Sequence, residues 1–334
     1  MSALPPGITA RLVRLGLAEE GTAIAAERLA GGVSSDIWKV AAGGSVFCVK
    51  RAMPKLAVKD DWFAPVERNR YERLWYEAAG SRVPGVAPAI IAHDDKAMFF
   101  VMAYLDPSHY RLWKPELLAG RVDVAFAATV GRKLAAIHAA TAGDEALAAA
   151  FPTDAIFEAL RLEPYLRAAA RRQPGVASAL EGLADRTAAT HIALVHGDVS
   201  PKNIMIGATG PVFLDAECAW YGDPAFDIAF CLNHLLLKCL HLPQMAGEFL
   251  AAFAALRDAY LDGVTWEPRA TLEVRAAALL PGLFLARIDG KSPVEYVTGE
   301  SARDRVRRVA LPLIANPPQR LDAVSAAWGR EILN

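Results

Sequence analysis

One short polar stretch constrains this chain more than any other feature. Residues 196–203 read His-Gly-Asp-Val-Ser-Pro-Lys-Asn, and Asp215 follows twelve residues later, after an apolar run. Phosphoryl transfer to an alcohol needs a carboxylate that orients the hydroxyl and accepts its proton, and Asp198 is the candidate catalytic base. Asn203 and Asp215 are candidate ligands of Mg²⁺, because this ion prefers oxygen donors. The stretch therefore predicts a phosphoryl-transfer site.

The pattern of apolar and turn residues changes after Leu105. Before it, short β-like runs and glycine pairs surround one segment with helical spacing, which predicts strands at 24–29, 37–40, 46–50, 90–92 and 98–104 and a helix at 66–80. After it, Ala and Leu dominate, which predicts helices at 121–141, 154–170, 176–190 and over most of 225–330. Short strands return at 193–196, 204–206 and 212–215. A small β-rich part is thus followed by a larger helical part.

The loop at 196–203, together with Gly-Asp-Pro-Ala-Phe-Asp-Ile-Ala at 222–229, resembles the aminoglycoside phosphotransferase-like kinases, which include choline and methylthioribose kinases. Gly197 stands where the kinase pattern H-R-D-x-x-x-x-N has an arginine. The resemblance implies an α+β, bilobal protein-kinase-like fold. It places a β-rich nucleotide-binding lobe at residues 1–104 and a mainly helical catalytic and substrate-binding lobe at 105–334. It also implies ATP and Mg²⁺ as cofactors, with GTP left open as the donor.

Within that resemblance, an ion pair is expected to position the nucleotide. Lys50 ends a β-like run, as does the kinase strand lysine that grips the α- and β-phosphates. Glu72 on the following helix is its best partner, with Glu77 as the alternative. Near the catalytic loop, His196 is expected to brace the loop by hydrogen bonding, and Asp227 resembles the structural acid of these kinases.

Two backbone segments are expected to complete the nucleotide site. The turn at residues 31–35 matches the phosphate-covering turn in position, so Gly32, Ser34 and Ser35 are expected to reach phosphate oxygens. A plain hairpin turn is the alternative. Adenine is expected to hydrogen-bond to the backbone around Ala103 and Tyr104, where these kinases join their lobes.

Bulk composition narrows the possible partners. The chain has 334 residues, of which 54% are hydrophobic, and its net charge is −1, so it has a large core and no basic footprint for nucleic acid. The apolar runs are too short to span a membrane, and the N-terminus lacks signal-peptide features. Four scattered cysteines without a C-x-x-C pair fit a reducing compartment. We expect a cytoplasmic protein that binds neither nucleic acid nor membrane, with its oligomeric state undetermined.

The acceptor is less constrained than the donor. Ser200 stands where protein kinases have a lysine, and no long activation segment follows Asp215, so a small-molecule acceptor is favoured. Residues 224–334 contain twelve acidic and twelve basic residues, which weakly disfavours a polycationic aminoglycoside. Residues 106–114 resemble the post-hinge region of methylthioribose kinases, although those kinases carry a different residue at the position of Asn203.

Several alternatives stay open. Residues 287–296 concentrate Arg, Asp, Lys and Glu, and form either a substrate-binding loop for a polar or anionic ligand or a structural ion-pair network. Glu217 either assists the metal or has a structural role. The favoured function is an ATP- and Mg²⁺-dependent phosphotransferase acting on a hydroxyl of a small polar metabolite or sugar. The alternatives are a non-catalytic nucleotide-binding regulatory protein and an aminoglycoside-modifying kinase.

Overall fold

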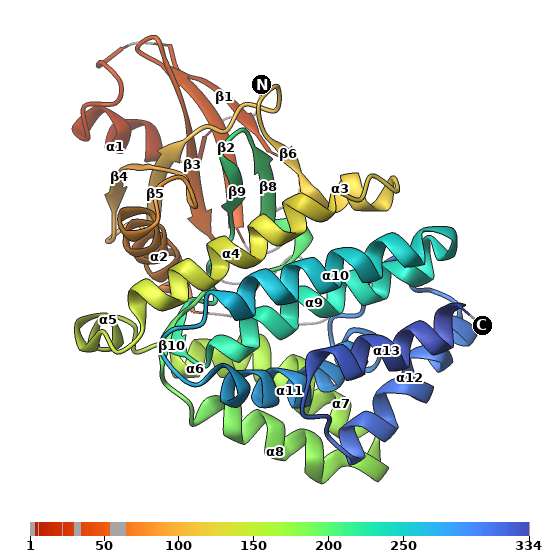
Figure 1. Cartoon of the computed structure of the whole chain (residues 1–334). Helices are drawn as coiled ribbons and strands as arrows, with labels where there is room; N and C mark the ends of the chain where they lie inside the picture. Colours follow the sequence, from red (N-terminus) through yellow and green to blue (C-terminus); the bar gives the residue numbers. More distant parts are fainter. Residues whose placement is uncertain (1–3, 6, 22, 30–34, 54–64, 334) are drawn as a thin grey trace.

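The computed structural model describes residues 4–5, 7–21, 23–29, 35–53 and 65–333 and has the expected α+β, bilobal architecture (Figure 1). The first part is an antiparallel sheet with the strand order β1-β2-β3-β5-β4. Its elements are α1 (Ile8–Arg14), β1 (Ala25–Arg28), β2 (Ser35–Ala42), β3 (Ser45–Ala52), α2 (Arg68–Arg82), β4 (Ile90–Asp94) and β5 (Phe99–Ala103). The five strands and α2 begin and end within about two residues of their predicted bounds, as pattern-based boundaries commonly do. The short helix α1 was not predicted.

A tight hairpin joins β2 to β3. Ala42 pairs with Ser45, so only Gly43 and Gly44 form the turn. Their φ angles are 57° and 76°, and two positive φ angles are what a type I′ turn requires. The turn therefore sets the register of β3, in which Lys50 lies opposite Ile37.

Alternate residues of β3 enter two different cores. Val49 lies in the same hydrophobic core as Leu12 of α1. Cys48 lies in the main core with Trp75 of α2. Because side chains alternate along a strand, Lys50 faces the same side as Cys48, toward α2 and the rest of the molecule.

Helices dominate the remainder of the chain (Figure 1). They are α3 (Trp113–Leu118), α4 (Val124–Thr141), α5 (Glu145–Ala150), α6 (Asp154–Phe157), α7 (Ala168–Arg172), α8 (Ala177–Ala188), α9 (Pro224–His241), α10 (Ala246–Asp262), α11 (Arg269–Asp289), α12 (Glu300–Ala315) and α13 (Leu321–Leu333). Helix α9 is buried from Pro224 to Cys239 and is the central helix of this helical part. Gly131 allows α4 to approach α10, because an added Cβ would lie 2.3 Å from the Leu256 oxygen. No helix in the described part of the chain is long and apolar enough to cross a membrane.

The helix predicted at 154–170 differs from the observed structure. The segment continues from α6 as a π-helix, η1 (Glu158–Arg167), before α7. Pro164 lies inside η1. Proline has no N–H to donate and its ring crowds the preceding turn, which disfavours a regular α-helix at this point. π-helical segments are uncommon and frequently occur at functional sites.

Short strands lie around the catalytic loop. They are β6 (Arg111–Leu112), β7 (Ala193–Val195), β8 (Ile204–Gly207), β9 (Gly210–Phe213) and β10 (Trp220–Gly222). In the β8–β9 hairpin, Ile204 pairs with Phe213. The Leu214 N–H donates to the backbone carbonyl oxygen of Asn203 at 2.8 Å. This hairpin brings the catalytic loop beside the segment that contains Asp215.

Candidate active site

The catalytic loop is held at its base by Asp227, in the first turn of α9. The Asp227 carboxylate accepts hydrogen bonds from the backbone N–H groups of His196 and Gly197, each at 2.8 Å. Its Oδ2 also lies 3.2 Å from Nε2 of His138 in α4. A buried carboxylate is stabilised by such donors and by the positive end of its helix. The geometry is the one expected of a structural acid.

The His196 ring connects the catalytic loop to the segment before Asp215. Its Nδ1 accepts the Asp198 N–H at 3.2 Å, and its Nε2 lies 3.0 Å from the Leu214 carbonyl oxygen. Because Nδ1 is an acceptor here, Nε2 carries the proton and donates to Leu214. Burial lowers the pKa of His196, which favours this neutral form. The ring therefore braces the loop, as the sequence predicted.

Gly197 is required by a close backbone contact. Its φ is 78°, and an added Cβ would lie 2.5 Å from the carbonyl oxygen of Cys218. A side chain at this position would therefore collide with the backbone and also strain the left-handed conformation. The arginine that the kinase pattern places here cannot be accommodated.

Arg161 of η1 supplies a guanidinium at this point instead. Its Nη2 lies 2.8 Å from Oδ2 of Asp198, and its Nε donates to the Gly197 carbonyl. Nζ of Lys202 lies 3.1 Å from the same Asp198 oxygen. Burial alone would raise the pKa of Asp198, but Arg161 and Lys202 outweigh it and hold the pKa below its usual value. Sequence reasoning missed Arg161, because it is one of several charged residues in η1 and belongs to no recognisable motif.

Asn203 and Asp215 bring two oxygen-bearing side chains to the same loop. Nδ2 of Asn203 donates to the Asp198 backbone oxygen at 3.1 Å, which fixes the orientation of the amide. Asp215 was predicted to end a strand at 212–215, but it lies two residues beyond the end of β9. Its backbone φ is 64°. No group of three or more His, Cys, Asp or Glu side chains with metal-binding geometry occurs among the described residues. A carboxylate and an amide oxygen still fit Mg²⁺, which commonly takes few protein ligands and completes its shell with phosphates and water.

Lys50 links the sheet to this loop through two carboxylates. Its Nζ lies 2.6 Å from Oε1 of Glu72 and 2.6 Å from Oδ1 of Asp215. Burial by itself would lower the pKa of Lys50, but Asp215 and Glu72 outweigh it and hold the pKa well above its usual value. The hydroxyl of Tyr76 donates to Glu72 and accepts the Asp215 N–H, each at 2.7 Å. The expected Lys50–Glu72 pair is therefore present, and Tyr76 connects its acid to the metal-binding candidate.

The partners of two acids bear on their competing assignments. Glu77, the alternative partner of Lys50, instead forms an ion pair with Arg73 at 2.7 Å. Oε2 of Glu217 lies 2.9 Å from Nε of Arg68, which favours the structural reading of that acid.

The structure describes only some of the other residues predicted to contact the nucleotide. Gly32 and Ser34 lie outside the described residues, whereas Ser35 is buried at the start of β2. The Ala103 N–H donates to the Ala89 backbone oxygen at 2.9 Å, so this donor is not free for adenine, and the expected adenine contact stays a prediction. The ring of Tyr104 lies 4.5 Å from Nζ of Lys39.

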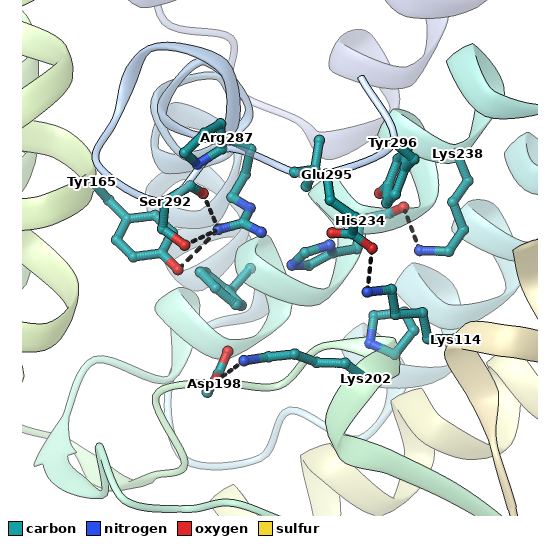
Figure 2. A pocket seen from close by; sticks show the side chains of 14 residues that line it. Lys114, Tyr165, Asp198, Lys202, His234, Lys238, Arg287, Ser292, Glu295 and Tyr296 are labelled. Atoms are coloured by element: carbon teal, nitrogen blue, oxygen red, sulfur yellow. Dashed lines mark hydrogen bonds and ion pairs between the residues drawn. The ribbon is translucent and has the colours of Figure 1, made fainter. Parts of the chain in front are cut away.

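A pocket of about 190 Å³ opens beside Asp198 (Figure 2). Its walls come from the catalytic loop, η1, α3, α9, α11 and the segment after α11. The lining includes the charged or polar residues Lys114, Tyr165, Asp198, Lys202, His234, Lys238, Arg287, Ser292, Glu295 and Tyr296. The segment 287–296 therefore lines a pocket next to the candidate base, and its Lys291 and Asp289 also form ion pairs with Glu163 and Arg307. Part of this segment thus forms structural ion pairs, and substrate binding by the part that lines the pocket stays a prediction.

Comparison with known proteins agrees with this geometry. The model of a family described as "Phosphotransferase enzyme family" matches residues 25–262. Among curated proteins, the chain is similar to methylthioribose kinase of Pectobacterium atrosepticum, with 26% identity over 71% of this chain and 66% of the relative. It is also similar to methylthioribose kinase of Yersinia enterocolitica, with 24% identity over 69% of this chain and 64% of the relative. The chain thus spans just under two thirds of the length of these relatives.

Solved structures share the fold at low identity. A choline kinase from Cryptosporidium parvum has a TM-score of 0.54 and 12% identity, covering 99% of this chain and 100% of that one. A choline/ethanolamine kinase family protein from Mesorhizobium loti has a TM-score of 0.52 and 18% identity, covering 96% of this chain and 97% of that one. The family match extends over most of the chain, and the chain belongs to the phosphotransferase enzyme family.

Proposed function

We propose that this chain transfers the γ-phosphoryl group of ATP to a hydroxyl of a small polar metabolite or sugar, with Mg²⁺ as cofactor. One observation carries the proposal: Lys50, from the sheet of the first part of the chain, meets Asp198, Asn203 and Asp215 of the catalytic-loop region at one site. Residues 1–104 would bind the nucleotide, and residues 105–334 would carry the catalytic loop and the acceptor pocket.

Binding of the phosphate donor would depend on the ammonium group of Lys50, which is already positioned without a ligand. Lys50 is held by Glu72 and Asp215, so its ammonium group is positioned for nucleotide phosphates before they bind. Asp215 and Asn203 are the residues that would hold Mg²⁺. When bound, this ion would neutralise the phosphate oxygens during transfer.

The acceptor side depends on Asp198. The acceptor oxygen forms a bond to the γ-phosphorus while the bond from that phosphorus to the β–γ bridging oxygen breaks, and ADP leaves with the electron pair. The hydroxyl proton passes to the Asp198 carboxylate. The lowered pKa of Asp198 makes it a weak base, which suits a transition state that releases this proton late. Arg161 and Lys202 keep the carboxylate ionised and oriented.

The two alternatives have less support. A non-catalytic nucleotide-binding protein would not need the base, the lysine and both metal-ligand candidates together. An aminoglycoside kinase would need to receive a polycation beside Lys114, Lys202, Lys238 and Arg287, which line the pocket. The volume of about 190 Å³ is also below the range of about 300–1,000 Å³ typical of drug-sized ligand sites.

Substitution of the base tests the proposal. We expect Asp198→Asn to reduce turnover by at least about 10²-fold, because it removes the proton acceptor. The measurement is Mg²⁺-dependent ADP formation across a panel of hydroxylated metabolites. The control is Asp258→Asn, which changes an exposed carboxylate paired with neighbouring Arg257 and should retain activity. Near-normal turnover of Asp198→Asn on an accepted substrate would refute the base assignment, and no ADP formation with any acceptor would favour a non-catalytic protein.

A further inference from the structure

Buried cations in this protein fall into two groups. Lys50, Arg68, Arg73, Arg161, Lys238 and Arg287 are the buried lysines and arginines of the described residues. Lys50, Arg68, Arg73 and Arg161 each contact a carboxylate. No ion pair to a carboxylate is present for Lys238 or Arg287 anywhere in the described part of the chain, and both line the pocket beside Asp198.

Lys238 of α9 is the more isolated of the two. It is 1% exposed, and its Nζ donates only a long hydrogen bond, at 3.3 Å, to the His234 carbonyl. The ammonium group also lies 5.4 Å from the centre of the Tyr296 ring. The Tyr296 hydroxyl is itself buried without a hydrogen-bond partner among the described residues. Burial, and secondly Lys114, lower the pKa of Lys238 to about 7, so its charge is poorly compensated in the free protein.

Arg287 of α11 has neutral partners only. Its Nη1 donates to the Tyr165 hydroxyl at 3.1 Å and to the backbone oxygen and hydroxyl of Ser292. These contacts fix the plane of the guanidinium but leave its charge unbalanced. Its buried Nε has no hydrogen-bond partner among the described residues. Figure 2 shows this group and Lys238 on separate walls of the same pocket, with Asp198 and Lys202 on a third.

The remaining groups of the pocket do not supply the missing negative charge. Glu295 is exposed and forms an ion pair with Lys114, while Asp198 is shared by Arg161 and Lys202. Burial, with Arg287 and Lys238 adding to it, lowers the pKa of His234 well below its usual value, so this imidazole is neutral.

Buried charges are normally paired, because an uncompensated one costs several kcal/mol. Two such cations facing one cavity next to a catalytic carboxylate therefore indicate that a ligand brings the counter-charge. We propose that the acceptor carries an anionic group, a carboxylate or a phosphate, which Lys238 and Arg287 bind while its hydroxyl lies at Asp198. This inference rests on the proposed phosphoryl transfer and names the class of its acceptor. The pocket volume limits that acceptor to a small metabolite.

Binding of simple anions tests the inference without turnover. The probes are inorganic phosphate, glycerate and glycerol 3-phosphate, with glycerol as the neutral match. Each is titrated by calorimetry into the full chain saturated with Mg²⁺ and a non-hydrolysable ATP analogue, so that the nucleotide phosphate site is already filled. We expect saturable binding of at least one anion and none of glycerol at the same concentrations. Preference for glycerate or for the phosphates identifies which anionic group is recognised.

Variants assign the binding to these cations. Lys238→Met and, independently, Arg287→Met should each weaken anion binding by about 10- to 100-fold, the usual cost of a lost charged hydrogen bond. The matched control is Lys291→Met, which removes an exposed lysine that pairs with Glu163 outside the pocket lining and should bind as the unmodified chain does. Two variants are used so that poor folding of one does not leave the question open.

The outcomes separate this inference from the proposed function. No anion binding, or equal binding by both pocket variants and the control, overturns the anionic-acceptor inference even if neutral polyols are phosphorylated. Anion binding that is lost in the pocket variants establishes the anion site of Lys238 and Arg287. If no acceptor then yields ADP, the phosphotransferase proposal fails while the anion site stands, and the bound anion is a ligand other than an acceptor.

Discussion

The two ends of this site treat buried charge in opposite ways. At one end, which comprises the proposed nucleotide site and the candidate base, Lys50 contacts two carboxylates and Asp198 contacts two cations. At the acceptor end, no carboxylate in the described part of the chain pairs with Lys238 or Arg287. The first set is organised without a ligand, as electrostatic catalysis requires. The second would be balanced by a bound anion, so the difference would separate the proposed catalytic groups from the groups proposed to select the acceptor.

The largest effect on stability is expected at the nucleotide end. Lys50→Met should lower the free energy of unfolding by about 3–5 kcal/mol, because it leaves Glu72 and Asp215 without their cation. Urea denaturation measures this change. The neighbouring control Arg51→Met alters an exposed side chain of the same strand and should have little effect. Equal stability of the two variants would show that the Lys50 pairs do not stabilise the fold.

The acceptor end should respond in the opposite direction. Lys238→Met should stabilise the free protein by about 1–4 kcal/mol, because it replaces a poorly compensated buried charge with an apolar side chain. Its pKa of about 7 lies below the ordinary value of 10.5, so the unfolded chain binds more protons between these pH values. The charged lysine therefore destabilises the folded state fully below pH 7 and progressively less as the pH rises toward 10.5.

The gain from Lys238→Met should accordingly be larger at pH 6 than at pH 9 in chemical denaturation. Lys291→Met, on the surface, serves as the control at both pH values. A loss of stability in Lys238→Met, or a gain independent of pH, would contradict the picture of an uncompensated charge.

A smaller loss of stability is expected at Tyr76, which connects the two carboxylates that pair with Lys50. Tyr76→Phe removes the hydroxyl that donates to Glu72 and accepts the Asp215 N–H, and should cost about 1–3 kcal/mol of stability. We also expect a modest fall in turnover, because Asp215 would lose a contact that holds its left-handed backbone conformation. Steady-state kinetics with varied Mg²⁺ would reveal weaker apparent metal affinity. An unchanged Mg²⁺ dependence would limit Tyr76 to a structural role.

Some features followed directly from local sequence. The five strands of the sheet and the hairpin at Gly43-Gly44 were predictable, because alternation and turn chemistry are short-range properties. The Lys50–Glu72 pair was predictable by resemblance and is present. The π-helix was not, because Pro164 interrupts a segment whose composition otherwise favours an ordinary helix. Asp215 was expected within a strand, whereas the structure places it in a left-handed turn after β9.

The amino-acid sequence alone determined the chemistry of the catalytic loop, because the spacing of Asp198, Asn203 and the following hairpin is local. It left the neighbourhood of that loop undetermined. Arg161 reaches Asp198 from η1, and Lys238 of α9 and Arg287 of α11 line the same pocket. Which side chains compensate a buried charge depends on helices that are distant in sequence and adjacent only after packing. The equal numbers of acidic and basic residues in 224–334 therefore gave no sign of a cationic pocket. Only the tertiary structure brings these cations to one cavity.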